Sequence, residues 1–199
     1  MSEVRMPTQK RGIEKRNKII EAGFKVICDK GYYNITTNDI AQEAGVSVGI
    51  IYQYFNDKKE IFIEGIKNYS KSIMFPLSEL NNKVNIDLSD LEELLNNMID
   101  HFIKSHTIGK KAHQEIISME HLDDEIDKIF LDLEIETTNN LCNLLRQNGM
   151  DIVNLEEKIH LSYNLIDNYC HEVLYHKHDN LNYDVMKENV IKMILSILK

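Results

Sequence analysis

The chain contains very few of the residues that form turns, with eight Gly and two Pro among 199 residues. Average usage would give more than twice as many, about 12% of a chain. β-Sandwiches, barrels and disordered linkers need Gly and Pro at their many turns, so the sequence argues against these classes. Apolar residues recur mostly at spacings of three and four, which predicts helices throughout.

Local signals place the ends of the first three helices. Gly31 is positioned as the C-cap of a helix over residues 12–30, where a left-handed residue is common. Thr36 followed by Asp39 predicts a capping box at the start of a short second helix, which Gly45 ends. Ser47 is a good N-cap for a third helix that runs to about residue 54.

Longer helices are expected in the rest of the chain. A fourth helix follows over residues 58–75 and ends before Pro76. The other predicted helices cover residues 89–105, 110–119, 123–148, 155–176 and 184–199.

Charge is divided unevenly along the chain. The formal net charge is −9, which taken whole argues against a nucleic-acid binder. Residues 1–60, however, hold ten Lys or Arg against eight Asp or Glu, whereas residues 61–199 hold thirteen against twenty-four. This asymmetry predicts that any contact with nucleic acid lies near the N-terminus.

Hydropathy and cysteine usage indicate the compartment. No stretch approaches the eighteen apolar residues of a membrane span, and the N-terminus lacks the apolar region of a secretory signal. The three cysteines, Cys28, Cys142 and Cys170, are far apart and odd in number, which favours reduced, buried thiols. We therefore expect a cytoplasmic protein that does not bind membranes.

The most informative segment covers residues 35–62 and reads ITTNDIAQEAGVSVGIIYQYFNDKKEIF. Two short helices separated by a turn that contains Gly form a helix-turn-helix. Residues 44–56 carry no charged side chain, so the third helix can approach phosphates without repulsion by carboxylates. The small core of this motif is expected to consist of Ile40, Ala41, Ala44, Val46, Ile51 and Phe55.

This segment resembles the N-terminal domain of the tetracycline-repressor (TetR) family. The matching residues are Thr36-Thr37, Ile40-Ala41, Ala44-Gly45-Val46-Ser47, Gly49, Ile51-Tyr52, Tyr54-Phe55 and Lys58-Lys59-Glu60, preceded by Ile19-Ile20-Glu21-Ala22 and Gly31-Tyr32. The remaining chain fits the family in length and helix content only. The resemblance implies an all-α fold with an N-terminal three-helix helix-turn-helix DNA-binding domain, residues 1–57. A larger helical ligand-binding and dimerisation domain, residues 58–199, would follow it.

The resemblance places the third helix in the major groove of DNA. Val48 and Gln53 are expected to face bases, since a Gln amide can pair bidentately with adenine and a Val methyl can contact a thymine methyl. Tyr and Thr hydroxyls can donate to phosphates, which fixes the register of a complex. The predicted DNA-binding residues are Thr37, Asn38, Val48, Gly49, Tyr52, Gln53, Tyr54 and Lys58, with Lys10, Arg11, Lys15 and Arg16 from the N-terminal arm.

The resemblance also implies a hollow helical body and a homodimer. Met and aromatic side chains suit an adaptable apolar pocket for a small-molecule effector. The candidate pocket residues are Phe62, Ile66, Tyr69, Met98, Phe102, Met119 and Phe130. Apolar stripes on the last two helices are either core of the chain or a subunit interface. The candidate interface residues are Leu165, Tyr169, Val173, Met186, Val190, Met193 and Ile197.

The expected function is that of a ligand-responsive repressor. As a homodimer it would bind a palindromic operator in double-stranded DNA and release it when an effector binds. We expect no metal, no cofactor and no enzymatic activity, because the chain lacks H-x-x-x-H, H-E-x-x-H, G-x-S-x-G and a Gly-rich phosphate loop. The alternative is a helical protein that uses its acidic body, where all eight histidines lie, to bind a protein partner, a metal or haem.

Overall fold

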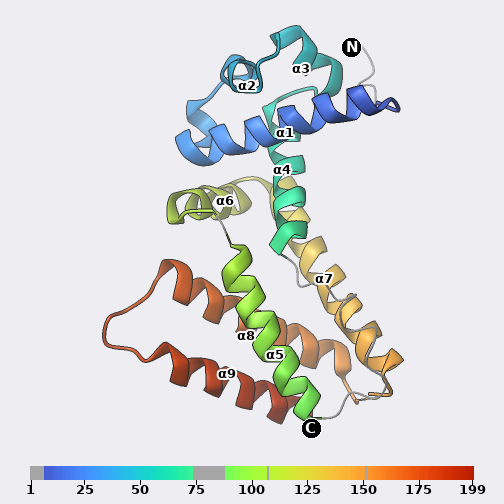
Figure 1. Ribbon diagram of the computed structural model, residues 1–199, viewed down its shortest axis with the longest axis vertical. Coiled ribbons are helices and arrows are strands. Elements are labelled where there is room, and N and C mark those ends of the chain that lie inside the picture. The colour runs from blue at the N-terminus through green and yellow to red at the C-terminus, as the bar shows by residue number, and fades with distance from the viewer. Residues whose placement is uncertain (1–6, 74–87, 107, 151) are drawn as a thin grey trace. The chain divides into compact units, whose positions relative to one another are not determined.

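All regular structure is helical in the computed structural model, which describes residues 7–73, 88–106, 108–150 and 152–199 (Figure 1). This confirms the predicted all-α class. The elements are α1 Lys10–Lys30, η1 Tyr32–Asn34, α2 Thr37–Ala44, α3 Val48–Tyr54, α4 Lys58–Ile73, α5 Leu88–Ser105, α6 Lys110–Leu122, α7 Asp124–Gln147, α8 Leu155–Tyr175 and α9 Tyr183–Ile197.

The helix ends lie within a few residues of their predicted positions, with two differences in detail. Gly31 caps α1 with φ 94° and ψ 141°, a positive φ that lies outside the left-handed helical region. Ser47 is the N-cap of α3, but its hydroxyl makes no capping hydrogen bond. The short 3-10 turn η1 had no signal in the sequence, and the predicted helix end at Pro76 lies outside the described residues.

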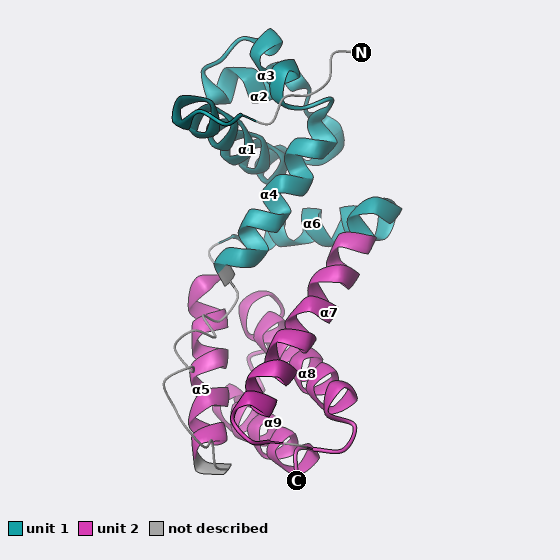
Figure 2. Ribbon diagram, turned by 90° about the vertical axis from the view of Figure 1, so that its right-hand side faces the viewer, with its two compact units in different colours: residues 1–72, 108–127 teal, residues 73–107, 128–199 magenta. Residues whose placement is uncertain are grey.

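The helices pack into two compact units (Figure 2). Residues 1–72 and 108–127 form the first, and residues 73–107 and 128–199 form the second. The first unit therefore holds α6 together with α1 to α4, although α6 is distant from them in sequence. The domain boundary predicted after residue 57 separates a DNA-binding part from an effector-binding and dimerisation part. Because this division is defined by function rather than by packing, it stays a prediction.

The core of the first unit depends on a close crossing of α1 and α4. Gly23 and Gly65 lie at this crossing, and a Cβ on Gly23 would overlap Cγ2 of Ile61. A Cβ on Gly65 would lie 2.6 Å from the ring of Phe24. The predicted core of the helix-turn-helix is buried except for Val46, which is half-buried.

The second unit has a core of its own, contributed by α5, α7, α8 and α9. The α8 and α9 helices pack on each other, and the Tyr169 hydroxyl donates to the carbonyl of Tyr183 at 3.0 Å. All three cysteines are buried and unpaired, as expected. Burial raises the pKa of the Cys28 and Cys170 thiols to about 12, so they stay protonated. No described helix is long and apolar enough to cross a membrane.

Candidate nucleic-acid interface

Two local devices set the geometry of the helix-turn-helix. At the start of α2 the Asp39 carboxylate accepts from the Thr36 backbone N–H at 2.7 Å, and the Thr36 hydroxyl accepts from Asp39 N–H at 3.4 Å. The Thr36 hydroxyl also donates to the Asp39 carboxylate at 2.6 Å, and this bond, followed by that from the Thr36 backbone N–H, lowers the pKa of Asp39. At the end of α2, Gly45 adopts φ 64° and ψ 38°, a conformation that favours Gly over residues with a Cβ. The predicted capping box and Gly turn are thus both confirmed.

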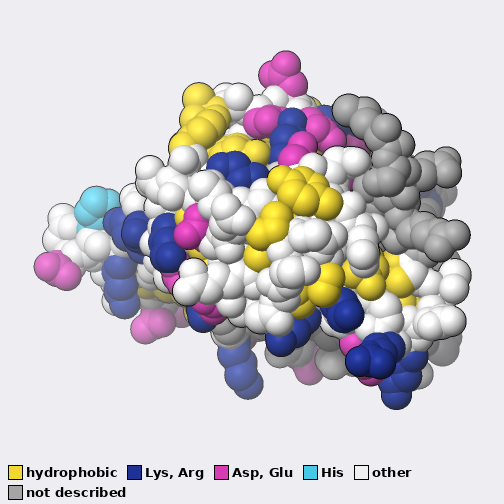
Figure 3. Space-filling view, turned by 90° about the horizontal axis from the view of Figure 1, so that it is seen from above, with side chains coloured by type: hydrophobic (Ala, Val, Ile, Leu, Met, Phe, Trp, Pro, Cys, Tyr) yellow, Lys and Arg dark blue, Asp and Glu magenta, His cyan; other side chains and the backbone are white. Residues whose placement is uncertain are grey.

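The α3 helix presents an uncharged surface to solvent. Ile51 and Phe55 are buried beneath it, which turns Gly49, Tyr52 and Gln53 outward. The Tyr52 side chain is 50% exposed. Seen from above, hydrophobic and uncharged side chains occupy much of the middle of the face, and Lys and Arg side chains gather toward its edges (Figure 3). An uncharged helix of this kind can enter the major groove of DNA, while cations from other elements of this face can contact the phosphates beside it.

Other predicted contacts are less open. Val48 and Tyr54 are half-buried, and the Tyr54 hydroxyl lies 3.8 Å from the position that a Cβ on Gly12 would take. Thr37 is half-buried and Asn38 is exposed, both in the first turn of α2.

The cations of α1 divide into exposed and internally bound groups. Lys10 and Arg11 are exposed in its first turn, and Lys15 is half-buried. The Arg16 guanidinium lies 2.8 Å from the Glu64 carboxylate and 4.9 Å from the centre of the Phe55 ring. The Glu64 carboxyl is partly desolvated, which raises its pKa, but the Arg16 charge and hydrogen bond lower it overall. Arg16 thus braces α1 against α4.

Lys58 also makes internal contacts. Its ammonium group donates to the carbonyls of Tyr32 at 2.6 Å and Ile35 at 2.8 Å, and it lies 4.4 Å from the centre of the Tyr32 ring. Burial lowers the pKa of Lys58. These contacts tie the start of α4 to the segment that precedes α2, so Lys58 has a structural role besides the predicted contact with phosphate.

Sequence reasoning missed one exposed cation near the turn. The Lys18 ammonium lies 3.6 Å from the position that a Cβ on Gly45 would take, beside the connection between α2 and α3. Its place on the polar face of α1, next to the buried Ile19 and Ile20, was the available signal.

The predicted effector residues are spread over both units. Phe62, Ile66 and Met119 are fully buried in the first unit, and Tyr69 stacks on Phe24 there with ring centres 5.8 Å apart. The second unit contains an apolar cavity of about 40 Å³, and the predicted residue Met98 contributes to its lining. The other side chains around it come from α5, α7, α8, α9 and the C-cap residue of α9: Leu91, Leu94, Leu95, Leu141, Leu144, Leu145, Ile159, Ser162, Tyr163, Ile166, Ile194 and Leu198.

Phe102 belongs instead to a cluster of aromatic and histidine rings in the second unit. The His106 ring lies 3.9 Å from the Phe102 ring and 5.5 Å from the His171 ring, centre to centre. His171 pairs with Asp167 at 3.0 Å and stacks on Tyr175 at 5.8 Å. Among the described residues, no group of three or more His, Cys, Asp or Glu side chains could hold a metal ion.

The burial of His106 in this cluster leads us to expect that the unfolding free energy depends on pH. Burial lowers the pKa of His106, the hydrogen bond to the Phe102 carbonyl raises it, and the charges of His171 and Asp167 act in opposite directions. The folded pKa lies below the unfolded value of about 6.5, so the unfolded chain binds the proton more readily. The unfolding free energy should therefore fall as pH drops through about 6.5 toward the folded pKa.

Urea denaturation at about pH 7.5 and about pH 5.5 measures how much unfolding free energy is lost on acidification. We expect this loss to be smaller in His106→Gln than in the native chain. The exposed His176 offers a matched control, and His176→Gln should behave like the native chain. An equal loss in His106→Gln and the native chain would contradict the effect assigned to burial.

The predicted interface residues also divide. Tyr169 and Val190 are 6% exposed and lie in the core of the second unit, so for them the intramolecular alternative describes the packing. Leu165, Val173, Met186 and Ile197 are half-buried, and Met193 is 47% exposed. Leu161 on α8 and Val185 on α9, which were not predicted, are 58% and 49% exposed. Both helices thus keep apolar surface after packing on each other, and the dimer role stays a prediction.

The all-helical fold and the exposed helix-turn-helix are typical of DNA-binding transcriptional regulators, and comparison with known proteins agrees. Residues 19–64 match the family of bacterial regulatory proteins, tetR family. The HTH-type transcriptional regulator HbdR of Aromatoleum sp. (strain CIB) is 49% identical over 55 residues, which is 28% of this chain and 24% of HbdR. This chain therefore spans only about a quarter of the length of HbdR.

A longer match extends into the helical body. An HTH-type transcriptional regulator encoded in the lacX 3′ region of Lactococcus lactis subsp. lactis is 30% identical over 137 residues, covering 65% of this chain and 69% of that protein. A crystal structure from Mesorhizobium loti, described as a TetR-family transcriptional regulator, superposes with a TM-score of 0.71 at 17% identity, over 96% of this chain and 98% of that one. The chain belongs to the TetR family of transcriptional regulators.

Proposed function

We propose that this chain is a repressor that binds a palindromic operator as a homodimer and releases it when a small molecule binds the helical body. The observation that carries the proposal is the exposed, uncharged surface of α3, where Tyr52 and Gln53 project from a buried base. The name of one relative supports repression. The negative transcriptional regulator IcaR of Staphylococcus epidermidis is 24% identical over 126 residues, 51% of this chain and 67% of IcaR.

The proposed contacts follow from side-chain chemistry. Tyr52 and Thr37 donate to phosphates and set the register, while Gln53 reads adenine and Val48 contacts a thymine methyl. The exposed Lys10, Arg11 and Lys18 supply the cations that flank the groove. Because the chain is acidic overall, affinity depends on these few placed groups rather than on bulk charge.

Selection of genomic DNA fragments by the purified chain tests the proposal directly. We expect retained fragments to share an inverted repeat whose half-sites lie about one helical turn apart, or a multiple of it. The logarithm of the association constant should fall linearly with the logarithm of salt concentration. Retention of fragments without a shared sequence, or no retention at all, would count against an operator-binding role.

For the homodimer we propose that the exposed apolar residues of α8 and α9 meet those of a second copy, in an interface that a two-fold axis makes self-complementary. Met193→Asp should shift the protein from dimer to monomer in light scattering at micromolar concentration, because it places a carboxylate in an apolar contact. Leu131→Asp on α7, where the native side chain is 54% exposed, is the matched control and should stay dimeric. A native chain that is monomeric, or a dimeric Met193→Asp variant, would refute the assigned interface.

For the effector we propose a small molecule with an apolar part. The cavity of the second unit is lined almost entirely by apolar side chains, and its volume of about 40 Å³ holds only a few water-sized groups. A larger effector therefore requires the surrounding helices to separate. A solved protein of the same fold, from Saccharomonospora viridis, is in complex with choline at 21% identity, which supports a small-molecule effector. Thermal-shift screening against small molecules, followed by operator release, tests this part.

A further inference from the structure

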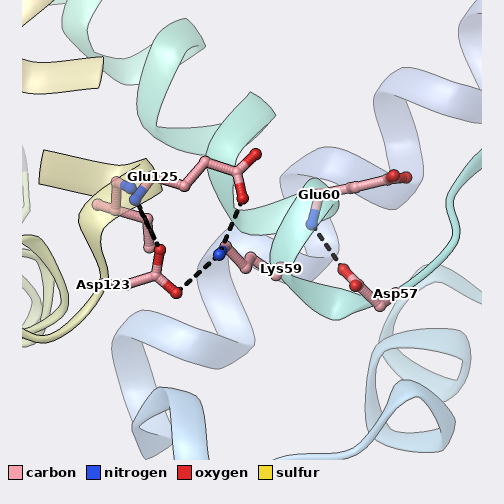
Figure 4. A network of polar contacts seen from close by, with 6 residues as sticks. Asp57, Lys59, Glu60, Asp123 and Glu125 are labelled. Atoms are coloured by element: carbon pink, nitrogen blue, oxygen red, sulfur yellow. Dashed lines mark hydrogen bonds and ion pairs between the residues drawn. The ribbon is translucent and has the colours of Figure 1, made fainter. Parts of the chain in front are cut away.

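Polar contacts within the first unit join α6 and the start of α7 to the base of the helix-turn-helix. The Glu115 carboxylate of α6 accepts from the Tyr32 backbone N–H at 2.6 Å. The Lys59 ammonium of α4 lies 2.8 Å from Asp123 and 2.8 Å from Glu125 (Figure 4). We call these residues, Tyr32, Lys59, Glu115, Asp123 and Glu125, the clasp.

Asp123 has two tasks at the corner between α6 and α7. One carboxylate oxygen, Oδ1, accepts from the backbone N–H groups of Glu125 at 3.1 Å and Ile126 at 3.3 Å, and so caps α7. The other, Oδ2, binds Lys59. The hydrogen bond from Lys59 lowers the pKa of Asp123, and the two carboxylates raise the pKa of Lys59. The Lys59 and Asp123 side chains are 26% and 23% exposed, so this pair is shielded more than a surface pair.

The clasp leads directly to the start of α2. Tyr32 is held at its N–H by Glu115 and at its carbonyl by Lys58, the neighbour of Lys59. Lys58 also holds the carbonyl of Ile35, which precedes the N-cap residue of α2. The corner between α6 and α7 therefore fixes the start of α4 and, through η1, the start of α2.

We propose that Glu115, Asp123 and Lys59 are positioning residues for operator binding, which hold η1 and α2 in place for DNA. This inference rests on the proposed function. If only charge mattered, removing an acidic side chain from a DNA-binding unit should strengthen its binding to phosphates. The positioning role predicts instead that removing Asp123 or Glu115 weakens operator binding.

Asp123→Asn is the central variant. Asn is as good an N-cap as Asp, so α7 keeps its cap while Lys59 loses the Asp123 charge. We expect the dissociation constant for the selected operator to rise about five- to tenfold, the size typical of coupling through a shared network. Asp124→Asn is the matched control, since Asp124 is exposed in the first turn of α7 and carries the same charge. Its operator affinity should be unchanged or slightly higher.

Two further variants separate positioning from direct contact with DNA. Lys59→Met should weaken binding at least as much as Asp123→Asn, because it removes the contacts of Lys59 with both Asp123 and Glu125. The double variant should bind no more weakly than Lys59→Met alone, because the contact between Lys59 and Asp123 is shared by both changes. Lys59→Arg should keep native affinity, since Arg also reaches two carboxylates. Equal or tighter binding by Asp123→Asn, or additive losses in the double variant, would overturn the proposal.

Amide hydrogen exchange tests the clasp in the absence of DNA. The amides of Tyr32 and of residues 33–36 should exchange faster in Asp123→Asn than in the native chain, and at native rates in Asp124→Asn. Unchanged rates in Asp123→Asn would overturn the clasp. A native chain that retains no operator refutes the proposed function instead, and the exchange rates then decide the clasp separately.

Discussion

Tyr52→Ala is expected to weaken operator binding by about 10- to 100-fold, or roughly 1.4–2.7 kcal/mol, the range for a hydrogen bond to a charged group. The variant removes a 50% exposed ring and hydroxyl from α3, and a symmetric dimer loses them in both half-sites. Because the exposed side chain packs little against the core, the unfolding free energy should change by less than about 0.5 kcal/mol.

Fluorescence anisotropy with a labelled operator at fixed salt measures this loss. Tyr33→Ala is the matched control, since Tyr33 is 70% exposed in η1 and lies outside the predicted contacts. Tyr52→Phe isolates the hydroxyl from the ring. Gln53→Ala should instead relax base preference at one operator position, by roughly 1–3 kcal/mol. A dissociation constant for Tyr52→Ala equal to that of the native chain would contradict the assignment of α3 as the DNA-recognition helix.

Gly23→Val is expected to lower the unfolding free energy of the chain by about 2–3 kcal/mol, the cost typical of overpacking a tight core. The first added atom would already overlap Cγ2 of Ile61, a fully buried and β-branched residue that cannot rotate away easily. The α1 and α4 helices would have to separate at their crossing.

Urea denaturation followed by circular dichroism measures the effect. Gly49→Ala serves as the control for helix propensity, because the nearest atom to an added Cβ there is the Ser47 hydroxyl at 4.0 Å. That variant should be as stable as the native chain or more stable, by up to about 1 kcal/mol. Equal stability of Gly23→Val and the native chain would mean that the crossing of α1 and α4 is not tightly packed.

The helix-turn-helix was predictable because its determinants are local. Thr36 and Asp39 form their capping box within one turn, and Gly45 takes its left-handed conformation at the point where the sequence breaks the helix. The spacing of Ile51 and Phe55 fixes which side of α3 is buried, and so leaves Tyr52 and Gln53 exposed. The exposure of these residues therefore follows from short-range pattern, whereas their proposed contacts with DNA come from the resemblance to the TetR family.

The effector and interface residues were harder to select because helical spacing marks a buried face without naming its partner. Met119 and Phe62 pack in the first unit, whereas Met98 lines a cavity in the second. Tyr169 and Met193 belong to similar stripes, yet the first is buried in the chain's own core and the second is exposed. Periodicity gives these residues the same description, since it contains no information about which helices meet.

By itself, the sequence determined the all-helical class, most helix ends and the outward side of α3, because backbone hydrogen bonding and capping act over a few residues. Only the tertiary structure decided which Lys and Arg side chains bind other groups of the same chain, and at which positions close helix packing requires glycine. Arg16 pairs with Glu64 and Lys59 with Asp123, and Lys58 donates to the carbonyls of Tyr32 and Ile35. The partners are separated by 23 to 64 positions in the chain. Such partners meet only when helices distant in sequence pack together.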